Sequence, residues 1–383
     1  MDFTLSDDVK MLQQTVQQYV RDRLMPLTMQ VEHEDEVPAG VLQEMKDLGL
    51  FSIPFPEEYG GGGFGELGYC LAMEELGAVN AAYSNIIGGH SSLSGMAIML
   101  SGSDDLKGRY LPAMSSGDKL GAFALTEPNA GSDAAHIQTT ARREGDGYAL
   151  NGSKLWVSNG PIADLYAVFA VTDKESGAKG ITAFVVDRDT AGVTVGTIDE
   201  KMGLRGSKTS QLFFEDCRVP ATNIIGEEGR GFAVAMQTLD RARVALGASC
   251  VGQAQHALNL AIQWSQQRMQ FGRPISSNQA VQWMLADSEI DIHAGRMMVY
   301  HAAWKIDSEQ RASHEAAVVK VYCSEMCNRV IDRAVQVHGG MGYMREFDIE
   351  RMYRDARILR IYEGTSEIQR LIIAGDLLGR DSP

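Results

Sequence analysis

The sequence predicts an α+β multidomain fold in which a helical domain, a β-domain and a bundle of long helices follow one another. Three observations support this plan. Apolar residues recur at helical spacing over residues 1–120, short β-rich runs alternate with turn residues over 121–226, and long helical patterns fill 227–383. We expect these ranges to form an N-terminal all-α domain, a middle antiparallel β-barrel or sandwich, and a C-terminal four-helix bundle.

The first block carries the periodicity of amphipathic helices. Asp7 and Asp8 precede a run in which Val9, Leu12 and Val16 share a helical face, so we expect a first helix with acidic residues in its first turn. The same periodicity predicts further helices over residues 40–48, 66–78 and 81–100. Because no strand pattern interrupts these segments, an all-α domain is the natural interpretation.

One stretch of this block, EEYGGGGFGELG, contains a formal GxGxxG match at Gly60, Gly62 and Gly65. A dinucleotide-binding fingerprint must follow a strand and open a helix inside a βαβ unit. Here the preceding residues are IPFPEEY, with two prolines, and the neighbouring patterns are helical. We therefore interpret the glycines as an interhelical loop and do not expect a Rossmann fold.

The middle block consists of short strands separated by turns. Its β-rich runs are YALNGSKLWVSNG, LYAVFAVT, ITAFVVDRD, GVTVGTI and SQLFFEDCRVP. Turn dipeptides such as Asp146-Gly147 and Ala191-Gly192 lie between them. Several short strands at this spacing are typical of an antiparallel sheet domain.

The third block begins after a glycine-rich turn at residues 226–231. Helical patterns cover residues 231–268, 278–307 and 313–338, and helices of this length predict a bundle. Cys323 and Cys327 lie at i, i+4 spacing on a face that we expect to be buried. The five cysteines and eight histidines show no metal-ligand spacing, so we expect no metal site and interpret the cysteines as free thiols in a reducing compartment.

The totals argue against two classes of partner. The net charge of −15 disfavours binding to nucleic acid and to anionic membrane surfaces, and no apolar run is long enough to span a bilayer. The N-terminal stretch MDFTLSDDVK lacks the basic and apolar regions of a signal peptide. We therefore expect a cytoplasmic protein.

Two segments of the β-domain are candidates for ligand binding. In FALTEPNAGSDA, exposed backbone N–H groups together with Thr126 and Ser132 could hold a polar ligand or phosphate, although a turn or N-cap role would explain Thr126 equally well. In KLWVSNG, Trp156 and Ser158 lie on one face of a strand. Tryptophan in a β-domain is usually a core residue, but an aromatic ring beside a hydroxyl also suits a planar heterocycle.

Three further stretches lie in the helical block. In LDRARV, Asp240 and Arg243 are at i, i+3 spacing and could form an ordinary ion pair. In QQRMQFGRPI, Arg268 lies near a helix end, where it is either a structural cation or a phosphate ligand. In AVQVHGGMGYMREF, a plain helix C-cap explains one glycine, while the run at residues 339–342 suggests close backbone approach to another group.

The stretch RIYEGTSEIQRL places Glu363 between an aromatic residue and a glycine, directly before an apolar helical pattern. A carboxylate at this point is either a solvated loop acid or a general base held on a rigid turn. The residues of this stretch alone leave both interpretations open.

In their order along the chain, LTEPNAGSDA, LWVSNG, RMQFGRPI, QVHGGMGY and IYEGTSEIQR resemble the motifs of the acyl-CoA dehydrogenases, and the resemblance extends essentially from end to end. It implies that family's fold, with the same three domains, and FAD as cofactor. It also implies an acyl-CoA substrate, an electron-transferring flavoprotein as partner, and a homotetramer in which FAD lies partly across a subunit interface.

The resemblance assigns roles to individual residues. Glu363 corresponds to the catalytic base. The positions that correspond to cofactor-binding residues are Phe123, Leu125, Thr126, Trp156, Val157, Ser158, Arg268, Gln270, Phe271, Asn278, Gln279, Gln336, Gly339, Gly340, Thr365 and Glu367. Those that correspond to substrate-binding residues are Ser132, Asp240, Arg243 and Gly364. Much of the group from Arg268 to Gly340 would serve the ADP end of FAD in a neighbouring subunit.

The implied reaction is α,β-dehydrogenation of an acyl-CoA thioester to the trans-2-enoyl-CoA. Glu363 removes the α-proton while the β-hydride goes to flavin N5. Burial beside an apolar acyl chain would raise the pKa of Glu363 and make it a better proton acceptor. Fixed donors, among them the backbone N–H of the base, would stabilise the developing enolate oxygen.

Some positions bear on the type of enzyme. Some family members carry the base at the position of Ala242, which cannot serve here, and this places the chain with the short- and medium-chain types. Ser84 stands where members acting on glutaryl-CoA have an arginine, so a dicarboxylic substrate is disfavoured. His90 and Ser91 either lie near the acyl pocket or have an N-capping or core role.

Two positions depart from the family pattern. Ser158 replaces a frequent threonine, and Glu367 replaces a frequent glutamine. Both replacements keep a hydrogen-bonding group. The alternatives on the same fold are an enoyl-CoA reductase or an acyl-CoA oxidase, and an alternative from another class is a catalytically silent flavin-binding module. The sequence does not specify the acyl group.

Overall fold

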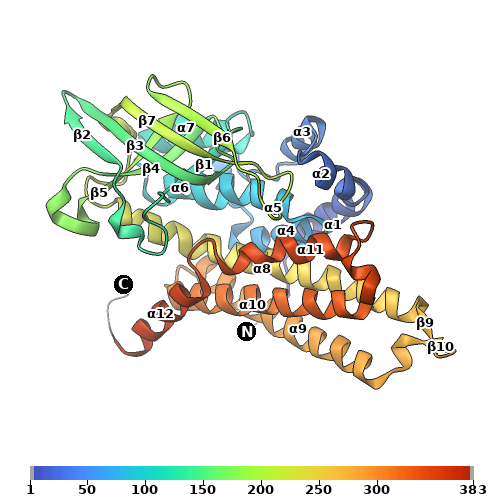
Figure 1. Ribbon diagram of the computed structural model, residues 1–383. Helices are drawn as coiled ribbons and strands as arrows, with labels where there is room; N and C mark the ends of the chain where they lie inside the picture. Colours follow the sequence, from blue (N-terminus) through green and yellow to red (C-terminus); the bar gives the residue numbers. More distant parts are fainter. Residues whose placement is uncertain (1–3, 380–383) are drawn as a thin grey trace.

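A computed structural model describes residues 4–379 of the chain. It has an N-terminal helical domain, a middle β-domain and a C-terminal helical domain, which confirms the predicted fold class (Figure 1). Residues 1–3 and 380–383, at the outer ends of the first and third predicted domains, lie outside the described residues, so part of the stretch used for the signal-peptide prediction does as well. Within residues 4–379, no helix combines the length and apolar character needed to cross a membrane.

The N-terminal domain consists of helices of moderate length, several of which begin at a capping side chain. Ser6 Oγ accepts the Val9 N–H at the start of α1, and Ser103 Oγ accepts the Leu106 N–H at the start of α7. The elements are α1 (Asp7–Tyr19), η1 (Val20–Leu24), η2 (Met25–Leu27), α2 (Thr28–Glu34), α3 (Ala39–Asp47), η3 (Glu57–Tyr59), α4 (Gly65–Val79), α5 (Ala81–Ile87), η4 (Gly88–Gly95), α6 (Met96–Ser101) and α7 (Asp104–Ser115).

The helix predicted over residues 81–100 is interrupted by the π-helix η4, whose sequence is GGHSSLSG. Ser92 Oγ donates to the Gly88 carbonyl and Ser94 Oγ donates to the His90 carbonyl, at 2.9 Å each. Hydroxyl groups that bond to carbonyls four residues earlier compete with the regular helix ladder. Apolar periodicity does not report this competition, which is why the pattern predicted one continuous helix.

The glycine-rich stretch before α4 forms a loop, as predicted. The N-terminus of α4 is occupied by a carboxylate of the same chain, because the backbone N–H groups of Glu66 and Leu67 donate to Asp307 Oδ1 and Oδ2 at 2.7 and 3.0 Å. A cap of this kind satisfies the free donors of a helix start. The end of α4 that a phosphate would need is therefore taken by an internal contact between the first and third domains.

The middle domain is an eight-stranded sheet with the order β6-β7-β3-β2-β4-β5-β8, and β1 pairs with β4. Most pairings are antiparallel, as expected, but β1 and β2 each pair with β4 in parallel. The strands are β1 (Gly121–Ala124), β2 (Thr140–Glu144), β3 (Gly147–Ser158), β4 (Leu165–Val171), β5 (Ile181–Asp187), β6 (Val193–Ile198), β7 (Thr209–Pro220) and β8 (Ile224–Ile225). Short 3₁₀ turns lie at Ala134–His136 (η5), Lys174–Gly180 (η6) and Ala221–Asn223 (η7).

The strand β4 shows why this domain carries continuous apolar runs. Leu165, Ala167 and Phe169 face a core shared with α6 and α7, whereas Tyr166 and Val168 face a second core on the other side of the sheet. Successive side chains on a strand point to opposite faces, so a strand that is covered on both sides must be apolar at every position.

The C-terminal domain is organised around α8, which packs against α4, α9 and α10. The helices are α8 (Gly231–Gln267), α9 (Gln279–Asp307), α10 (Ser313–His338), α11 (Asp348–Ala356) and α12 (Ser366–Leu377). The connecting elements are β9 (Met269–Gln270), β10 (Arg273–Pro274), η8 (Ile275–Ser277), η9 (Gly339–Tyr343) and η10 (Arg357–Arg360). In Figure 1 the three long helices run side by side below the sheet, with β9 and β10 at the end farthest from it.

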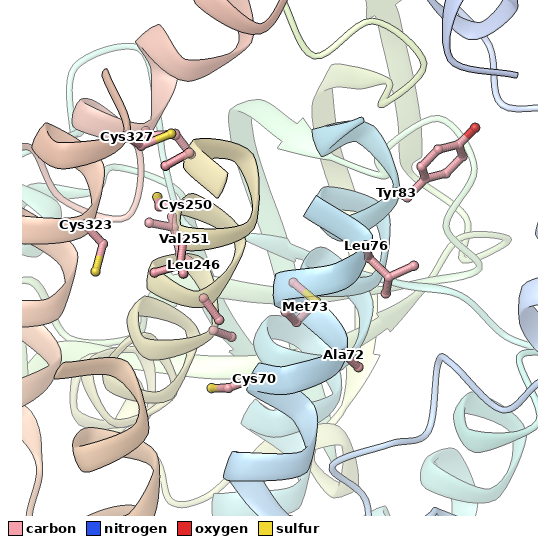
Figure 2. Packing of buried hydrophobic residues seen from close by; sticks show 14 of the residues in the cluster. Cys70, Ala72, Met73, Leu76, Tyr83, Leu246, Cys250, Val251, Cys323 and Cys327 are labelled. Atoms are coloured by element: carbon pink, nitrogen blue, oxygen red, sulfur yellow. The ribbon is translucent and has the colours of Figure 1, made fainter. Parts of the chain in front are cut away.

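The contact between α4, α8 and α10 is close because small side chains line it. A Cβ added to Gly252 of α8 would lie 1.8 Å from the Glu74 carbonyl oxygen of α4. Figure 2 shows Cys250 of α8 near Cys323 and Cys327 of α10 in this core. All five cysteines of the chain are buried and free.

Candidate active site

A cavity of about 490 Å³ lies where the three domains meet. The N-terminal domain contributes Met73, Ser84 and Ser92, the β-domain contributes Phe123, Thr126 and Trp156, and the C-terminal domain contributes Arg243, Ser249 and Glu363. Residues far apart in the sequence therefore line one concave surface. A single large pocket at a domain junction is the usual place for a substrate or cofactor site.

Glu363 lies in this lining, on a left-handed turn between η10 and α12. Its φ is +57° and that of Gly364 is +90°. The carboxylate oxygen Oε2 is shielded from solvent and has no hydrogen-bond partner among residues 4–379. Burial raises the pKa of Glu363 to about 7, and the nearby cations Arg243 and Lys320 oppose this rise.

The turn is held by donors on its carbonyl oxygens. Arg243 Nε and Gln369 Nε2 donate to the Glu363 carbonyl at 3.1 and 3.0 Å, and Lys320 Nζ donates to the Gly364 carbonyl at 2.6 Å. An ordinary residue in the left-handed region is strained, and it persists where the surroundings hold it. A side chain on Gly364 would also collide with Gln369, because a Cβ there would lie 2.5 Å from Nε2.

Two of the residues predicted to bind substrate also support this turn. Arg243 lines the cavity and is buried, and its Nη1 lies 3.1 Å from Asp240 Oδ1. Asp240 accepts a second hydrogen bond from Ser313 Oγ at 2.5 Å and does not line the cavity. Asp240 therefore acts on the site through Arg243. The other two predicted substrate residues, Ser132 and Gly364, are both in the lining.

The β-domain side of the cavity contains most of the predicted flavin wall: Phe123, Leu125, Thr126, Trp156 and Ser158. A register shift between β3 and β7 at residues 154–157 leaves Trp156 with a φ of +54° and a side chain that is 63% exposed. The bulge thus turns a large aromatic ring out of the core and into the cavity. Val157, in contrast, points into the core of the domain.

Thr365 and Glu367 lie beyond the Glu363–Gly364 turn, outside the cavity lining. Thr365 is the N-cap of α12, where its Oγ1 accepts the Ile368 N–H at 3.3 Å. Glu367 is exposed in the first turn of the same helix. A carboxylate at this position interacts favourably with the helix dipole.

The remaining predicted cofactor residues form a separate group at the far end of the helical domain. They are Arg268, Gln270, Phe271, Asn278, Gln279, Gln336, Gly339 and Gly340. At about 1.5 Å per residue, Arg243 and Arg268 are roughly 38 Å apart along α8. Phe271 in the β9–β10 turn is 96% exposed. Within a single chain, this group of residues therefore lies away from the cavity.

Three sequence models of one family match nearly the whole chain. They are the acyl-CoA dehydrogenase N-terminal domain at residues 6–118, the middle domain at residues 122–217 and the C-terminal domain at residues 229–378. The chain belongs to the acyl-CoA dehydrogenase family. The resemblance predicted from the motifs is thereby confirmed.

Individual relatives agree with this membership. The human mitochondrial short-chain specific acyl-CoA dehydrogenase is 44% identical over 98% of this chain and 91% of its own length. The acryloyl-CoA reductase (NADH) of Anaerotignum propionicum is 41% identical over 99% of this chain and 97% of its own length. A chain in the solved structure of the electron transferring flavoprotein of Acidaminococcus fermentans superposes with a TM-score of 0.97, at 41% identity and full coverage of both chains.

The cavity of this family member fits the ring end of FAD. Trp156 and Phe123 offer aromatic surface, and the hydroxyl groups of Thr126 and Ser158 line the same side. An exposed tryptophan held at a positive φ has no packing role in its own domain, which favours a planar ligand as its partner. Glu363, whose Oε2 has no hydrogen-bond partner within residues 4–379, lines the same cavity.

Several residues of the site were not predicted from sequence. Lys320 is fully buried on α10, and Glu127 and Lys154 form a buried ion pair behind the predicted flavin wall. Charged residues inside otherwise apolar patterns were the available signal. For His90, where the prediction left two roles open, the structure shows a core role: its Nδ1 accepts the Gly121 N–H, its Nε2 lies 3.1 Å from the Met114 carbonyl, and it is absent from the lining.

Burial lowers the pKa of His90 to about 4, so the ring is neutral at physiological pH. Ser91 is likewise a core residue, because its Oγ donates to the Phe51 carbonyl at 2.7 Å. Through these hydrogen bonds, His90 and Ser91 hold the π-helix η4 against the chain at Phe51 and at Met114 and Gly121. They contribute to the shape of the cavity only through η4.

Proposed function

We propose that this chain is an FAD-dependent acyl-CoA dehydrogenase that converts an acyl-CoA thioester to the trans-2-enoyl-CoA, with Glu363 as the base. One observation supports this most strongly: Glu363, whose Oε2 has no hydrogen-bond partner within residues 4–379, and the exposed Trp156 line the same cavity. The catalytic, cofactor-binding and substrate-binding roles predicted for individual residues are part of this proposal.

The Glu363 carboxylate takes the α-proton. A base with a pKa near 7 is substantially ionised at neutral pH and still binds a proton far more strongly than a solvated carboxylate. Binding of the acyl chain removes water from the carboxylate and strengthens the base further. FAD, when bound, supplies the acceptor for the β-hydride.

The turn that carries the base also offers a donor for the thioester oxygen. Among the described residues, the backbone N–H of Glu363 makes no hydrogen bond, while the Glu363 carbonyl accepts from Arg243 and Gln369. A free, fixed N–H beside the base is suited to stabilise the negative charge that develops on the thioester oxygen. The N–H and the carboxylate of one residue would thus act on neighbouring atoms of the substrate.

The assembly and the partners belong to the same proposal. The exposed group around Arg268 and Phe271 would bind the ADP end of FAD held by a neighbouring subunit, which favours a homotetramer. The likeness to a chain in an electron transferring flavoprotein structure supports such a flavoprotein as electron acceptor. Five free thiols support a reducing, cytoplasmic location.

An anaerobic stopped-flow experiment tests the proposal. Saturated acyl-CoA thioesters should bleach the flavin absorbance of the purified yellow protein, and the bleached enzyme should reoxidise slowly in air but rapidly with an electron-transferring flavoprotein. Rapid reoxidation by dioxygen would indicate an oxidase. Bleaching by NADH, with no bleaching by acyl-CoA, would indicate a reductase, as in the name of the Anaerotignum relative. A colourless protein that takes up no FAD would contradict the proposal outright.

A further inference from the structure

Lys320 is a buried ammonium with an unusual environment. It lies on α10, its side chain is 0% exposed, and its Nζ donates to the Gly364 carbonyl at 2.6 Å. It forms no salt bridge within the described residues, whereas Lys154, the other fully buried lysine, pairs with Glu127 at 2.7 Å. Burying an ammonium without a carboxylate in contact is costly, so a group of this kind points to a specific role.

The titratable groups that interact with Lys320 lie on α8, on α10 and on the turn before α12. Arg243 and Cys250 lie on α8, Glu325 lies on α10 itself, and Glu363 lies on the turn before α12. Arg243 is already paired with Asp240. Neither Glu363 nor Lys320 forms a salt bridge within residues 4–379. Of the two cations that lower the pKa of Glu363, Arg243 and Lys320, only Lys320 therefore has no carboxylate in contact with it.

We propose that Lys320 is a positioning residue for the dehydrogenation: it holds the left-handed Glu363–Gly364 turn by the Gly364 carbonyl and supplies a positive charge beside the turn that carries the base. This inference rests on the proposed function of Glu363. Arg243 and Gln369 hold the preceding carbonyl, so the three side chains fix two successive peptide groups. Lys320 supplies the only one of these three contacts that comes from α10.

The Lys320 ammonium and the Glu363 carboxylate each favour the charged form of the other group. Burial lowers the pKa of Lys320 to about 8 while the Glu363 carboxylate opposes this, and the ammonium in turn lowers the pKa of Glu363 against the effect of burial. At neutral pH the lysine is therefore mainly protonated. Removing its charge would leave the base more protonated at the same pH.

The experiment compares Lys320→Met with wild type and with a control variant, Lys305→Met. Lys305 of α9 pairs with Glu315 of α10, and neither residue lines the cavity. Flavin reduction by butyryl-CoA is followed anaerobically across pH. In Lys320→Met we expect the rate at neutral pH to fall about 10- to 100-fold, and the acid limb of the profile to move up by about one pH unit. Lys320→Arg should keep the acid limb of wild type. Lys305→Met should keep both the wild-type rate at neutral pH and the wild-type acid limb.

A second readout does not depend on the flavin. The infrared band of the protonated Glu363 carboxyl group, identified by its loss in Glu363→Gln, should persist to about one pH unit higher in the FAD-free form of Lys320→Met than in the FAD-free wild type. Binding of an unreactive acyl-CoA thioether should stay within about threefold of wild type, because the lysine does not line the cavity. Wild-type enzyme that is not bleached by any acyl-CoA would count against the proposed function, and the infrared shift would still decide the role of Lys320.

Three results would overturn the inference. The first is a Lys320→Met holoenzyme with an unchanged rate and acid limb. The second is an equal loss in Lys305→Met. The third is failure of both Lys320→Met and Lys320→Gln to fold with FAD, because the lysine would then serve folding and not the turn.

Discussion

Lys154 and Glu127 form an ion pair, 2.7 Å from Nζ to Oε1, in the interior directly behind the cavity wall. Lys154 Nζ also donates to the Leu125 carbonyl at 3.2 Å, and Glu127 accepts the backbone N–H groups of Gln138 and Thr139 at 2.6 and 3.0 Å. The pair thus joins the strand that carries Trp156 to the loop that carries Thr126. Two motifs that are separate in the sequence are held as one wall.

Breaking this pair should destabilise the protein strongly. Lys154→Met leaves the Glu127 carboxylate buried without its cation, which should cost about 3–5 kcal/mol in the free energy of unfolding. The double variant Glu127→Gln with Lys154→Met should recover part of this loss, because it buries no unpaired charge. Denaturant unfolding of the FAD-loaded enzymes measures both values. Lys10→Met, which removes an exposed pair with Asp7, is the control and should change stability by about 0.5 kcal/mol or less.

Glu363→Gln should abolish proton abstraction while it leaves the cavity intact. The amide has nearly the shape of the carboxylate but cannot accept the α-proton, so flavin reduction by acyl-CoA should slow by about 10² to 10⁴-fold. Stopped-flow reduction measures the rate, and spectral titration with an unreactive thioester checks that binding is retained. A Glu363→Gln enzyme that binds the thioester and keeps full flavin reduction would show that another residue is the base.

The raised pKa of Glu363 predicts a pH-dependent cost in stability. In the unfolded chain this carboxyl ionises near its ordinary pKa, and in the folded protein it ionises near pH 7. The folded state therefore holds an extra proton between these values, and stability falls as pH rises through this interval. Glu363→Gln removes the effect, so the variant should exceed wild type by about 1–3 kcal/mol at pH 8 and by much less at pH 5.

Guanidinium unfolding at the two pH values measures this difference. Glu58→Gln changes an exposed carboxylate outside the cavity and should leave the difference between pH 5 and pH 8 as in wild type. An equal effect of Glu363→Gln at both pH values would contradict a perturbed carboxyl group. The expected gain in stability of Glu363→Gln comes with a loss of activity, since the same burial that destabilises the folded protein strengthens the base.

The buried serine pair in the cavity lining should set the acyl chain length. Ser84 is 3% exposed and its hydroxyl lies 3.0 Å from that of Ser249, whereas Ser132, also in the lining, is exposed. Ser84→Leu adds bulk to the buried part of the lining, so the ratio of kcat/KM for hexanoyl-CoA over butyryl-CoA should fall about 10- to 100-fold. Ser84→Ala removes the hydroxyl without filling the space and should keep the ratio near that of wild type. An unchanged ratio in an active Ser84→Leu enzyme would place the acyl chain elsewhere.

The long helices could be predicted from sequence nearly to the residue. Periodicity predicted helices over residues 231–268, 278–307 and 313–338, and the structure has α8, α9 and α10 at Gly231–Gln267, Gln279–Asp307 and Ser313–His338. Each presents apolar residues at a constant spacing over many turns, which is the strongest signal a single sequence carries. The helix predicted over residues 81–100 was less accurate, because hydroxyl groups of η4 redirect its carbonyls locally.

Topology inside the β-domain was harder to predict. The parallel pairing of β1 with β4 depends on contacts between residues about forty positions apart, such as Gly121 and Leu165. Alternation of polar and apolar residues specifies which face a strand buries but not its neighbour. For the same reason, the bulge that exposes Trp156 could be found only from the register of β3 against β7.

The sequence by itself determined the order of the three domains and, through its motifs, the family and the identity of Glu363 as the predicted base. Only the tertiary structure decided which charges meet: Lys320 at the turn of the base, and Glu127 with Lys154 behind the wall. The reason is physical. Periodicity and motif order are local properties of the chain, whereas a pKa or an ion pair depends on distance and burial in space, which are set when segments far apart in the sequence pack together.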